Sequence, residues 1–414
     1  MKRPLRSALS TVALTTGLVL TMSACGFGSS KSDDSDPNTL TFLAPIYSDG
    51  TKSEWSAIID DFQKVNPDIT VKLSMESWKS INNVVRTDLQ DTRSTPDILN
   101  IDAYSTFATD GKLYPASDIV DPSVISDIQP GFAKNASMSG TQWALPLFAS
   151  TRRLYYNTDL FAKAGIAAPP KTWAELADAA KKIQALGGGV SGYGLPLGSE
   201  EAQGETSIWT FGAGGDWSAG DQVTVDTPAN LEGVKAMKAM ADDGVTEPNP
   251  GATNRLDVIN AFIQGQIGMI EGLPPTISQI ADKNPSLKYA TAPSPTKTGD
   301  LVTLGVADHL MAFKKDGKKA PAIKKFLTYF YSAAVYSKFV SSEHFISATN
   351  SGATALADDP VTKAFLSTLS VAKFYPSNNP KWGAAQGAIQ QQIGTIAQGK
   401  DPASVLQQIQ QAAS

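Results

Sequence analysis

Residues 39–76 read TLTFLAPIYSDGTKSEWSAIIDDFQKVNPDITVKLSME, and they contain a complete strand, helix and strand. The apolar run 40–45 predicts the first strand, and Asn66-Pro67 ends the helix that follows. The second strand is predicted over 69–75, where apolar residues alternate with polar ones as they do when one face of a sheet is buried. The predicted helix has its apolar residues at helical spacing: Trp55, Ile58, Ile59, Phe62 and Val65.

The next segment continues the same alternation of strands and helices. Val84, Val85 and Leu89 predict a second helix, and Pro96 precedes the apolar run 97–101, which predicts a third strand. This order is typical of parallel strands joined by right-handed crossovers, with helices on both faces of the sheet. The predicted fold class is therefore α/β, with ligands bound beyond the carboxyl ends of the strands.

The middle of the chain repeats this pattern with a different sequence. Strands are predicted over 143–147, 153–157, 223–225 and 267–271, and a helix over 255–264. Thr172 and Glu175 form the capping-box pattern at the start of another helix. Thr227-Pro228 predicts an N-terminal cap with proline in the first turn. A second α/β assembly is expected from this region.

The N-terminal 26 residues are similar to a bacterial lipoprotein signal. Lys2, Arg3 and Arg6 precede the mostly apolar run 8–24, and small residues surround Cys25, the only cysteine of the chain. We expect residues 1–24 to be a signal peptide, Cys25 to be lipidated, and the polar segment 25–38 to be a flexible tether. Met22 departs from the usual leucine. An ordinary secretory signal and an uncleaved transmembrane helix are the alternatives.

Composition excludes several classes of function. Removal of the three basic residues of the signal leaves 32 Lys and Arg against 40 Asp and Glu, a formal charge of −8, which argues against nucleic-acid binding. With one cysteine and two histidines, neither disulfides nor a zinc site is expected, and no cofactor is predicted. The roughly 390 remaining residues suggest two domains.

The order and spacing of several motifs carry a family resemblance over nearly the whole mature chain. They are FQKVNP (62–67), PDI (96–98), GKL (111–113), YYNTDLFAKAGI (155–166), PKTWAEL (170–176), AFIQGQIGM (261–269) and the helical segment 319–331. Together they resemble the extracellular solute-binding proteins, family 1, of carbohydrate ABC importers, the group that includes maltose-binding protein.

The resemblance implies a two-lobed, periplasmic-binding-protein-like fold. Each lobe would be a mainly parallel sheet flanked by helices, with the ligand cleft between the lobes. The implied lobes are 39–147 with 305–345, and 148–304 with 346–414, and the chain would cross between them near 146–149, 303–305 and 345–349. The implied function is a monomeric lipoprotein on the outer face of the bacterial membrane. It would deliver a mono- or oligosaccharide to an ABC permease that has a cytoplasmic ATPase.

A sugar cleft needs aromatic rings for stacking and polar groups for hydroxyls. Candidates lie just past predicted strand ends, at the implied crossings, or before the glutamine-rich helix. The predicted ligand-binding residues are Tyr47, Asp49, Glu76, Trp78, Asp102, Tyr104, Ser150, Arg152, Trp209, Glu271, Asp308, His309 and Trp382. Structural alternatives stay open for several of them, including an ion pair for Arg152 and a helix cap for Asp102 or Asp308.

Two departures from the maltose-binding pattern concern specificity. The segment 272–275 reads GLPP where that relative has a stacking tryptophan, and Gln386 replaces another, so maltodextrin is not the predicted ligand. Enzyme signatures are missing: the GxGxxG match at 187–192 follows a helix, which indicates a helix stop and a loop. A lipid-anchored glycoside hydrolase and a non-catalytic surface lipoprotein remain the alternative functions.

Overall fold

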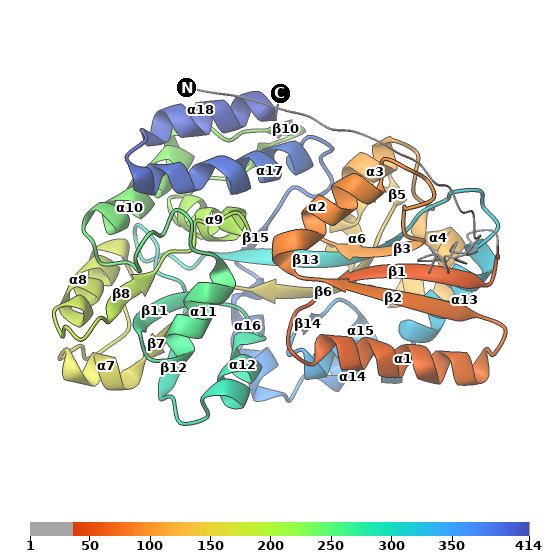
Figure 1. Cartoon of the computed structure of the whole chain (residues 1–414), viewed down its shortest axis with the longest axis horizontal. Helices are drawn as coiled ribbons and strands as arrows, with labels where there is room; N and C mark the ends of the chain where they lie inside the picture. The colour runs from red at the N-terminus through yellow and green to blue at the C-terminus, as the bar shows by residue number, and fades with distance from the viewer. Residues whose placement is uncertain (1–35, 414) are drawn as a thin grey trace, which may run out of the picture.

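The computed structural model describes residues 36–413 and has two lobes, each built on its own β-sheet (Figure 1). The predicted signal peptide, Cys25 and residues 26–35 of the predicted tether lie outside the described residues. The two-lobed α/β fold predicted from the sequence is confirmed.

The first sheet has seven strands, in the order β14-β6-β13-β3-β1-β2, with β15 also paired to β13. Strand β1 pairs in parallel with β2 and β3, as the β-α-β-α-β pattern predicts. Strand β13 runs antiparallel to β3 and β6. The strands are β1 (Thr39–Pro45), β2 (Thr70–Glu76), β3 (Ile98–Ile101), β6 (Leu145–Thr151), β13 (Thr303–Ala312), β14 (Ile346–Ser347) and β15 (Ala372–Phe374).

Helices and one small hairpin surround this sheet. The helices are α1 (Thr51–Val65), α2 (Trp78–Asp88), α3 (Ser105–Thr109), α4 (Ala116–Ile119), α5 (Pro122–Asp127), α6 (Pro130–Asn135), α13 (Ala320–Phe330), α14 (Ala333–Ser342) and α15 (Asn350–Ala355). The hairpin is formed by β4 (Ser137–Met138) and β5 (Thr141–Gln142).

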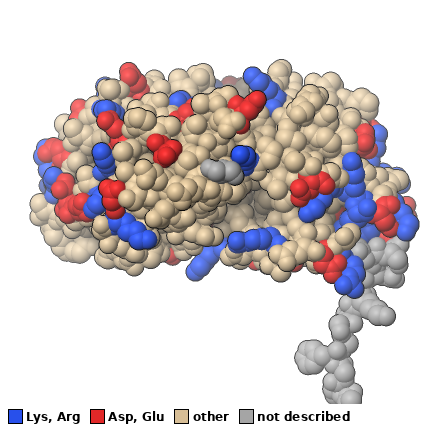
Figure 2. Space-filling view, turned by 90° about the horizontal axis from the view of Figure 1, so that it is seen from above, with Lys and Arg blue, Asp and Glu red and all other residues tan. Residues whose placement is uncertain are grey.

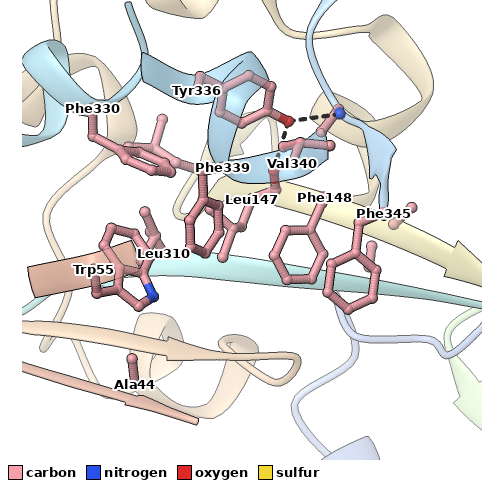
Figure 3. Close-up of a cluster of buried hydrophobic side chains, with 14 of the residues drawn as sticks. Ala44, Trp55, Leu147, Phe148, Leu310, Phe330, Tyr336, Phe339, Val340 and Phe345 are labelled. Atoms are coloured by element: carbon pink, nitrogen blue, oxygen red, sulfur yellow. Dashed lines mark hydrogen bonds between the residues drawn. The ribbon is translucent and has the colours of Figure 1, made fainter. Parts of the chain in front are cut away.

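An aromatic cluster packs between these helices and the sheet (Figure 3). Trp55 is fully buried, with its ring 4.5 Å from that of Phe339 and 4.8 Å from that of Phe330. Phe148 and Phe345 stack face to face at 3.8 Å. Buried aromatic rings contribute strongly to stability, so this cluster fixes α1 and α14 against the sheet.

The second sheet has four strands in the order β12-β7-β11-β8. These strands are β7 (Arg153–Asn157), β8 (Ser191–Gly194), β11 (Ile267–Gly272) and β12 (Tyr289–Ala292). Around them lie α7 (Thr158–Lys163), α8 (Trp173–Gln184), α9 (Ala202–Gly212), α10 (Pro228–Asp242), α11 (Arg255–Ile263), α12 (Thr276–Lys283), α17 (Trp382–Gln392), the 3-10 helix η1 (Ile393–Gln398) and α18 (Pro402–Ala412). Helix α16 (Pro360–Leu369) instead contacts β6 and β14 of the first sheet. A short hairpin pairs β9 (Ser218–Ala219) with β10 (Gln222–Val223).

Several local predictions are confirmed. Helix α8 has the predicted capping box, in which Thr172 and Glu175 satisfy each other's backbone amides. Thr227 caps α10, and β7 has the predicted bounds. The prediction that the sheets are mainly parallel is wrong. In the second sheet β7 is antiparallel to both of its neighbours, and only the pair of β11 with β8 is parallel. The predicted strand over 143–147 instead runs from Leu145 to Thr151.

One edge of β13 changes its partner at the middle of the strand. Residues 303–305 pair in parallel with β15, and residues 309–312 pair antiparallel with β3. Because the two partners run in opposite directions, their carboxyl ends face each other across residues 306–308. Between Asp308 and His309 the register with β6 also shifts, as in a β-bulge. The sheet therefore has a gap between the two lobes, where polar side chains can gather.

Candidate functional site

A narrow cavity, which we call the inner cavity, lies at this gap in the sheet. Its volume is about 30 Å³, which is room for little more than a water molecule. Asp102 and Tyr375 come directly after the facing ends of β3 and β15. The lining residues are Tyr47, Trp78, Asn82, Asp102, Ser150, Arg152, Glu200, Glu201, Gln203, Arg255, Leu273, Val306, Asp308, Phe345, Tyr375 and Gln386.

Asp308 is the central carboxylate of the first-lobe wall. Its side chain lines the inner cavity, and the register shift between β13 and β6 falls directly after it. Asp308 is 6% exposed, and among residues 36–413 its Oδ1 has no hydrogen-bond partner. Burial, together with the nearby Asp102 and Glu201, raises the pKa of Asp308 well above its ordinary value. Such a carboxyl needs a donor to replace the water it has lost.

The second-lobe wall carries a network of two arginines and two glutamates. Arg152 donates to Glu201 Oε1 at 2.6 Å and to Ser150 Oγ at 3.1 Å. Arg255 also pairs with Glu201, and its Nη2 lies 3.6 Å from Glu200 Oε1. Each guanidinium group is thus balanced by protein carboxylates. This wall offers no guanidinium free to neutralise an anionic ligand.

Gln203 presents a second unpaired group to the inner cavity. It is 5% exposed, and within the described part of the chain its Oε1 has no hydrogen-bond partner. Gln203 lies near the start of α9, close to the Arg152 ion pair with Glu201. Asp308 and Gln203 therefore present two buried acceptors without donors, one from each lobe.

A larger groove adjoins the inner cavity. It has a volume of about 710 Å³ and runs between α2 and α3 of the first lobe and α17 of the second. Trp78, Asn82, Asp102 and Gln386 line both spaces, so the two are neighbours. Figure 2 views the molecule from the α17 side, and charged side chains gather mainly toward the two ends of that face. We call this space the outer groove.

The structure brings six of the thirteen predicted site residues together at the inner cavity: Tyr47, Trp78, Asp102, Ser150, Arg152 and Asp308. Three other predicted residues line neither the inner cavity nor the outer groove. Asp49 is exposed after β1, Glu76 accepts from Ser80, and Glu271 accepts a 2.7 Å hydrogen bond from Ser294. Burial raises the pKa of Glu271 to about 8.

The other four predicted residues have structural contacts in the interior. Trp209 is 2% exposed and donates to Glu205, and Trp382 is fully buried against Tyr375. Tyr104 donates to the backbone oxygen of Asn135. His309 is buried beside it, with Nδ1 3.0 Å from the backbone oxygen of Asp102, and burial lowers the pKa of His309 to about 4. Their rings are enclosed by protein in this structure, and ligand contact by these four residues stays a prediction.

The sequence reading missed ten residues of the inner cavity. Glu200, Glu201 and Gln203 follow β8, a strand that was not predicted because it overlaps the glycine-rich segment 187–192. Tyr375 follows β15, which is only three residues long. The rule that ligands meet the carboxyl ends of strands would have found these four had the strands been recognised. The remaining six, Asn82, Arg255, Leu273, Val306, Phe345 and Gln386, are brought in by tertiary packing.

Neither a metal-binding cluster nor a membrane-spanning helix occurs among the described residues. Between residues 36 and 413, no three His, Cys, Asp or Glu side chains are grouped so that they could hold a metal ion. Over the same range, none of the helices has both the length and the apolar character needed to cross a bilayer.

Residues 47–336 match the family described as bacterial extracellular solute-binding protein. The chain belongs to this family. A binding protein of Brucella abortus is 31% identical over 339 residues, covering 80% of each chain. The multiple sugar-binding protein of Streptococcus mutans is 22% identical over 354 residues, covering 80% of this chain and 79% of that protein.

Solved structures share the fold of this solute-binding protein. An ABC transporter solute-binding protein of Thermotoga lettingae, bound with α-D-tagatose, has a TM-score of 0.80 and 23% identity, covering 91% of this chain and 100% of that one. The GacH receptor of Streptomyces glaucescens, studied unliganded and with acarbose, has a TM-score of 0.79 and 22% identity, covering 90% and 97%. Members of this family act outside the cytoplasm, as their description states.

Proposed function

We propose that this solute-binding protein captures a carbohydrate between its lobes and delivers it to the permease of an ABC importer. The observation that carries the proposal is the pair of buried acceptors, Asp308 Oδ1 and Gln203 Oε1, that have no donor in the described chain. A sugar presents many hydroxyl donors on an otherwise uncharged frame, so it would satisfy both acceptors. The inner cavity of about 30 Å³ has no room for a sugar ring, so the sugar would enter while the lobes are farther apart. Trp78 at the edge of the cavity provides an aromatic surface for the sugar ring.

The balance of charge favours a neutral sugar over a sugar phosphate. Both arginines of the inner cavity are already paired with Glu200 and Glu201, and the carboxyl groups of Asp102 and Asp308 lie beside them. A phosphate group in the inner cavity would lie near these carboxyl groups, where both of the described guanidinium groups are already paired. Several relatives with this fold were solved with sugars, including α-D-tagatose, and the Streptococcus mutans relative is named for sugar binding.

Ligand capture is proposed to close the lobes around the sugar. The chain would pass between the lobes near 146–149, 303–305 and 345–349, which divides it into 39–147 with 305–345 and 148–304 with 346–414. Within the last of these segments, β14, α15 and β15 lie at the first sheet. A ligand that contacts both Asp308 and Gln203 has more contacts in the closed form, so it favours that form. The proposed product of closure is a monomeric complex that a permease with a cytoplasmic ATPase can recognise.

Lipidation of Cys25 is proposed to hold this complex at the outer face of the membrane. Residues 2–24 have the basic and apolar segments of a signal peptide, and small residues surround the cysteine. Two or more acyl chains give stable anchoring, and a tether keeps the domain close to its permease. Mass spectrometry of the mature N-terminus tests this directly: we expect a lipid-modified Cys25, and an unmodified cysteine would contradict it.

A thermal-shift screen of neutral mono- and oligosaccharides tests the binding function. A bound sugar stabilises the folded chain by RT ln(1 + [L]/Kd), so Tm rises with the logarithm of the sugar concentration above Kd. Asp308→Asn should weaken binding of the active sugar by about 10- to 100-fold, because the amide replaces one carboxyl oxygen with an NH₂ group and a buried polar group left unpaired costs about 1–3 kcal/mol. Asp60→Asn, on the exposed surface of α1, is the matched control.

Two results would count against the proposed function. Failure of every sugar to raise the Tm of the wild-type chain would contradict carbohydrate binding. Chromatography of the same incubations would show shorter products if the chain were a glycoside hydrolase, and we expect the oligosaccharides to be recovered intact.

A further inference from the structure

The carboxyl groups at the inner cavity come from both lobes. Asp102 and Asp308 belong to the first-lobe wall, where no lysine or arginine is among the described lining residues. The second-lobe wall has two arginines and two glutamates, so its formal charges cancel. With both aspartates ionised, the two walls would together hold four negative charges and two positive ones around a space of about 30 Å³.

Closure of the lobes is what removes water from the two aspartates. In this structure Asp308 is 6% exposed and Asp102 is 5% exposed, and the second-lobe wall faces them across the inner cavity. When the lobes move apart, this wall leaves the carboxyl groups and water takes its place. Burying an ionised carboxyl group that has no cationic partner is unfavourable, so closure and the charge of the first-lobe wall oppose each other.

The two aspartates differ in the donors that they have. Asp102 accepts a 2.9 Å hydrogen bond from a glutamine amide of α17, whereas Oδ1 of Asp308 has no partner among the described residues. Burial, with the nearby Asp102 and Glu201, raises the pKa of Asp308, and Arg152 and Tyr47 only partly oppose this rise. Of the two carboxyl groups, Asp308 is therefore the one that holds a proton more readily.

The other ionisable groups around Asp308 are neutral or paired. They are Tyr47, Asp102, Arg152, Glu200, Glu201, Arg255, His309 and Tyr375. Burial raises the pKa of both tyrosines well above 10 and lowers the pKa of His309 to about 4, so all three are neutral between pH 5 and 8. The two glutamates are paired with the two arginines, and Asp102 has its amide donor.

We propose that closure of the lobes in the ligand-free chain is coupled to uptake of a proton by Asp308, so that lower pH favours the closed form. The proton removes one excess negative charge and turns one oxygen of Asp308 into a donor. Gln203 Oε1, a buried acceptor without a donor in the described chain, lines the same cavity from the second lobe. The inference concerns the lobes before any solute binds, so it does not depend on which solute is captured.

The direction of the pH dependence follows from proton linkage. Asp308 has a higher pKa in the closed form, where it is buried, than in the open form, where water surrounds it. Above the ordinary value of 3.8, the open form loses a proton that the closed form keeps. The ratio of closed to open forms should therefore fall as pH rises, by up to about tenfold per pH unit.

Small-angle X-ray scattering of the ligand-free chain between pH 5 and 8 tests the inference. We expect the radius of gyration of the wild type to increase with pH as the open form gains population. Asp308→Asn is neutral at every pH, so its radius of gyration should stay constant. Glu271→Gln is the matched control: it also removes a buried carboxyl group with a raised pKa, but Glu271 lines neither the inner cavity nor the outer groove. This variant should keep the wild-type dependence.

Asp102→Asn gives a second, independent variant. It removes a charge that raises the pKa of Asp308, so the increase in radius with pH should be smaller than in the wild type. Infrared difference spectra between pH 5 and 8 follow the proton itself: the wild type should have a protonated-carboxyl C=O component that Asp308→Asn lacks.

A constant radius of gyration in the wild type would overturn the inference. A wild-type dependence in Asp308→Asn, or infrared spectra that are the same for both chains, would overturn it as well. These measurements contain no sugar, so failure of every sugar to bind would contradict the proposed function without changing their outcome.

Discussion

The amide of Gln386 donates a 2.9 Å hydrogen bond to the carboxylate of Asp102, which joins α17 of the second lobe to the residue after β3 of the first. Gln386 is 6% exposed and Asp102 is 5% exposed, so the bond is shielded from water. Burial raises the pKa of Asp102, and the bond from Gln386 opposes this shift. The two lobes thus share a buried polar contact at the wall common to the inner cavity and the outer groove.

Loss of this contact should destabilise the chain and open the cleft. Gln386→Leu removes the donor and leaves a buried carboxylate oxygen unpaired, which costs about 1–3 kcal/mol. We expect a lower free energy of unfolding in urea and a larger radius of gyration by small-angle X-ray scattering without sugar. Gln391→Leu, on the exposed side of α17, is the control. An unchanged radius of gyration in Gln386→Leu would show that the contact does not hold the lobes together.

The stability of the chain should depend on pH through Glu271. Burial raises the pKa of Glu271 from 4.5 to about 8, so between these values the folded state holds a proton that the unfolded state has lost. The free energy of unfolding contributed by this group therefore falls as pH rises through the window, by roughly 1.4 kcal/mol per unit. Below pH 4.5 both states are protonated and the effect is absent.

Glu271→Gln removes this titration and keeps an acceptor for Ser294. We expect the variant to gain stability relative to the wild type as pH rises from 5 to 8, measured by urea unfolding at each pH. Glu232→Gln is the control, because Glu232 is exposed and its pKa is lowered by Lys297, which places its titration below the window. A constant difference between Glu271→Gln and the wild type across this range would refute the prediction.

The aromatic cluster under α1 should be sensitive to the size of Trp55. Trp55→Ala leaves a cavity beside Phe330 and Phe339 and should lower the free energy of unfolding by about 3–5 kcal/mol. Trp55→Phe keeps an aromatic ring and removes a buried indole N–H that has no partner among the described residues, so its loss should be smaller. Urea unfolding followed by circular dichroism measures both, and equal losses would contradict the packing argument.

Tyr336 should stabilise the segment around Ala348, which follows α14 and β14 in the chain. Its hydroxyl accepts from the Ala348 amide at 2.8 Å and donates to the Leu147 backbone oxygen at 2.6 Å (Figure 3). Tyr336→Phe leaves the buried amide unpaired and should cost about 1–3 kcal/mol. Hydrogen exchange at Ala348 should become faster, whereas Tyr329→Phe, at the half-buried edge of α13, should leave that exchange unchanged.

Local sequence signals predicted much of the fold but less of the inner cavity. The capping box at Thr172 and the bounds of β7 depend on neighbouring residues, so the sequence contains the whole signal. Whether two strands pair in parallel depends on segments far apart, as for β13 with β3, where residues about 210 positions apart are paired. The prediction of mainly parallel sheets failed for that reason.

Burial distinguishes the predicted tryptophan that lines the inner cavity from the one that lies in the core. Trp78 and Trp209 have similar sequence signals, yet Trp78 lines the inner cavity and Trp209 lies in the core with a hydrogen bond to Glu205. Nothing local distinguishes an aromatic ring that faces a cleft from one that faces its own lobe. Asp102 was predictable because it directly follows a recognisable strand, whereas Tyr375 follows a strand too short to recognise.

The β-bulge at Asp308 restricts how this site can evolve. Side chains alternate between the two faces of a strand, so deleting one residue of β13 beside the bulge would exchange the surroundings of Asp308 and His309. The buried imidazole would then lie where the carboxylate is now. Substitutions at position 308 can change which sugar is held, but insertions or deletions there would dismantle the wall. Homologues with different ligands should therefore keep the length of this strand while varying its residues.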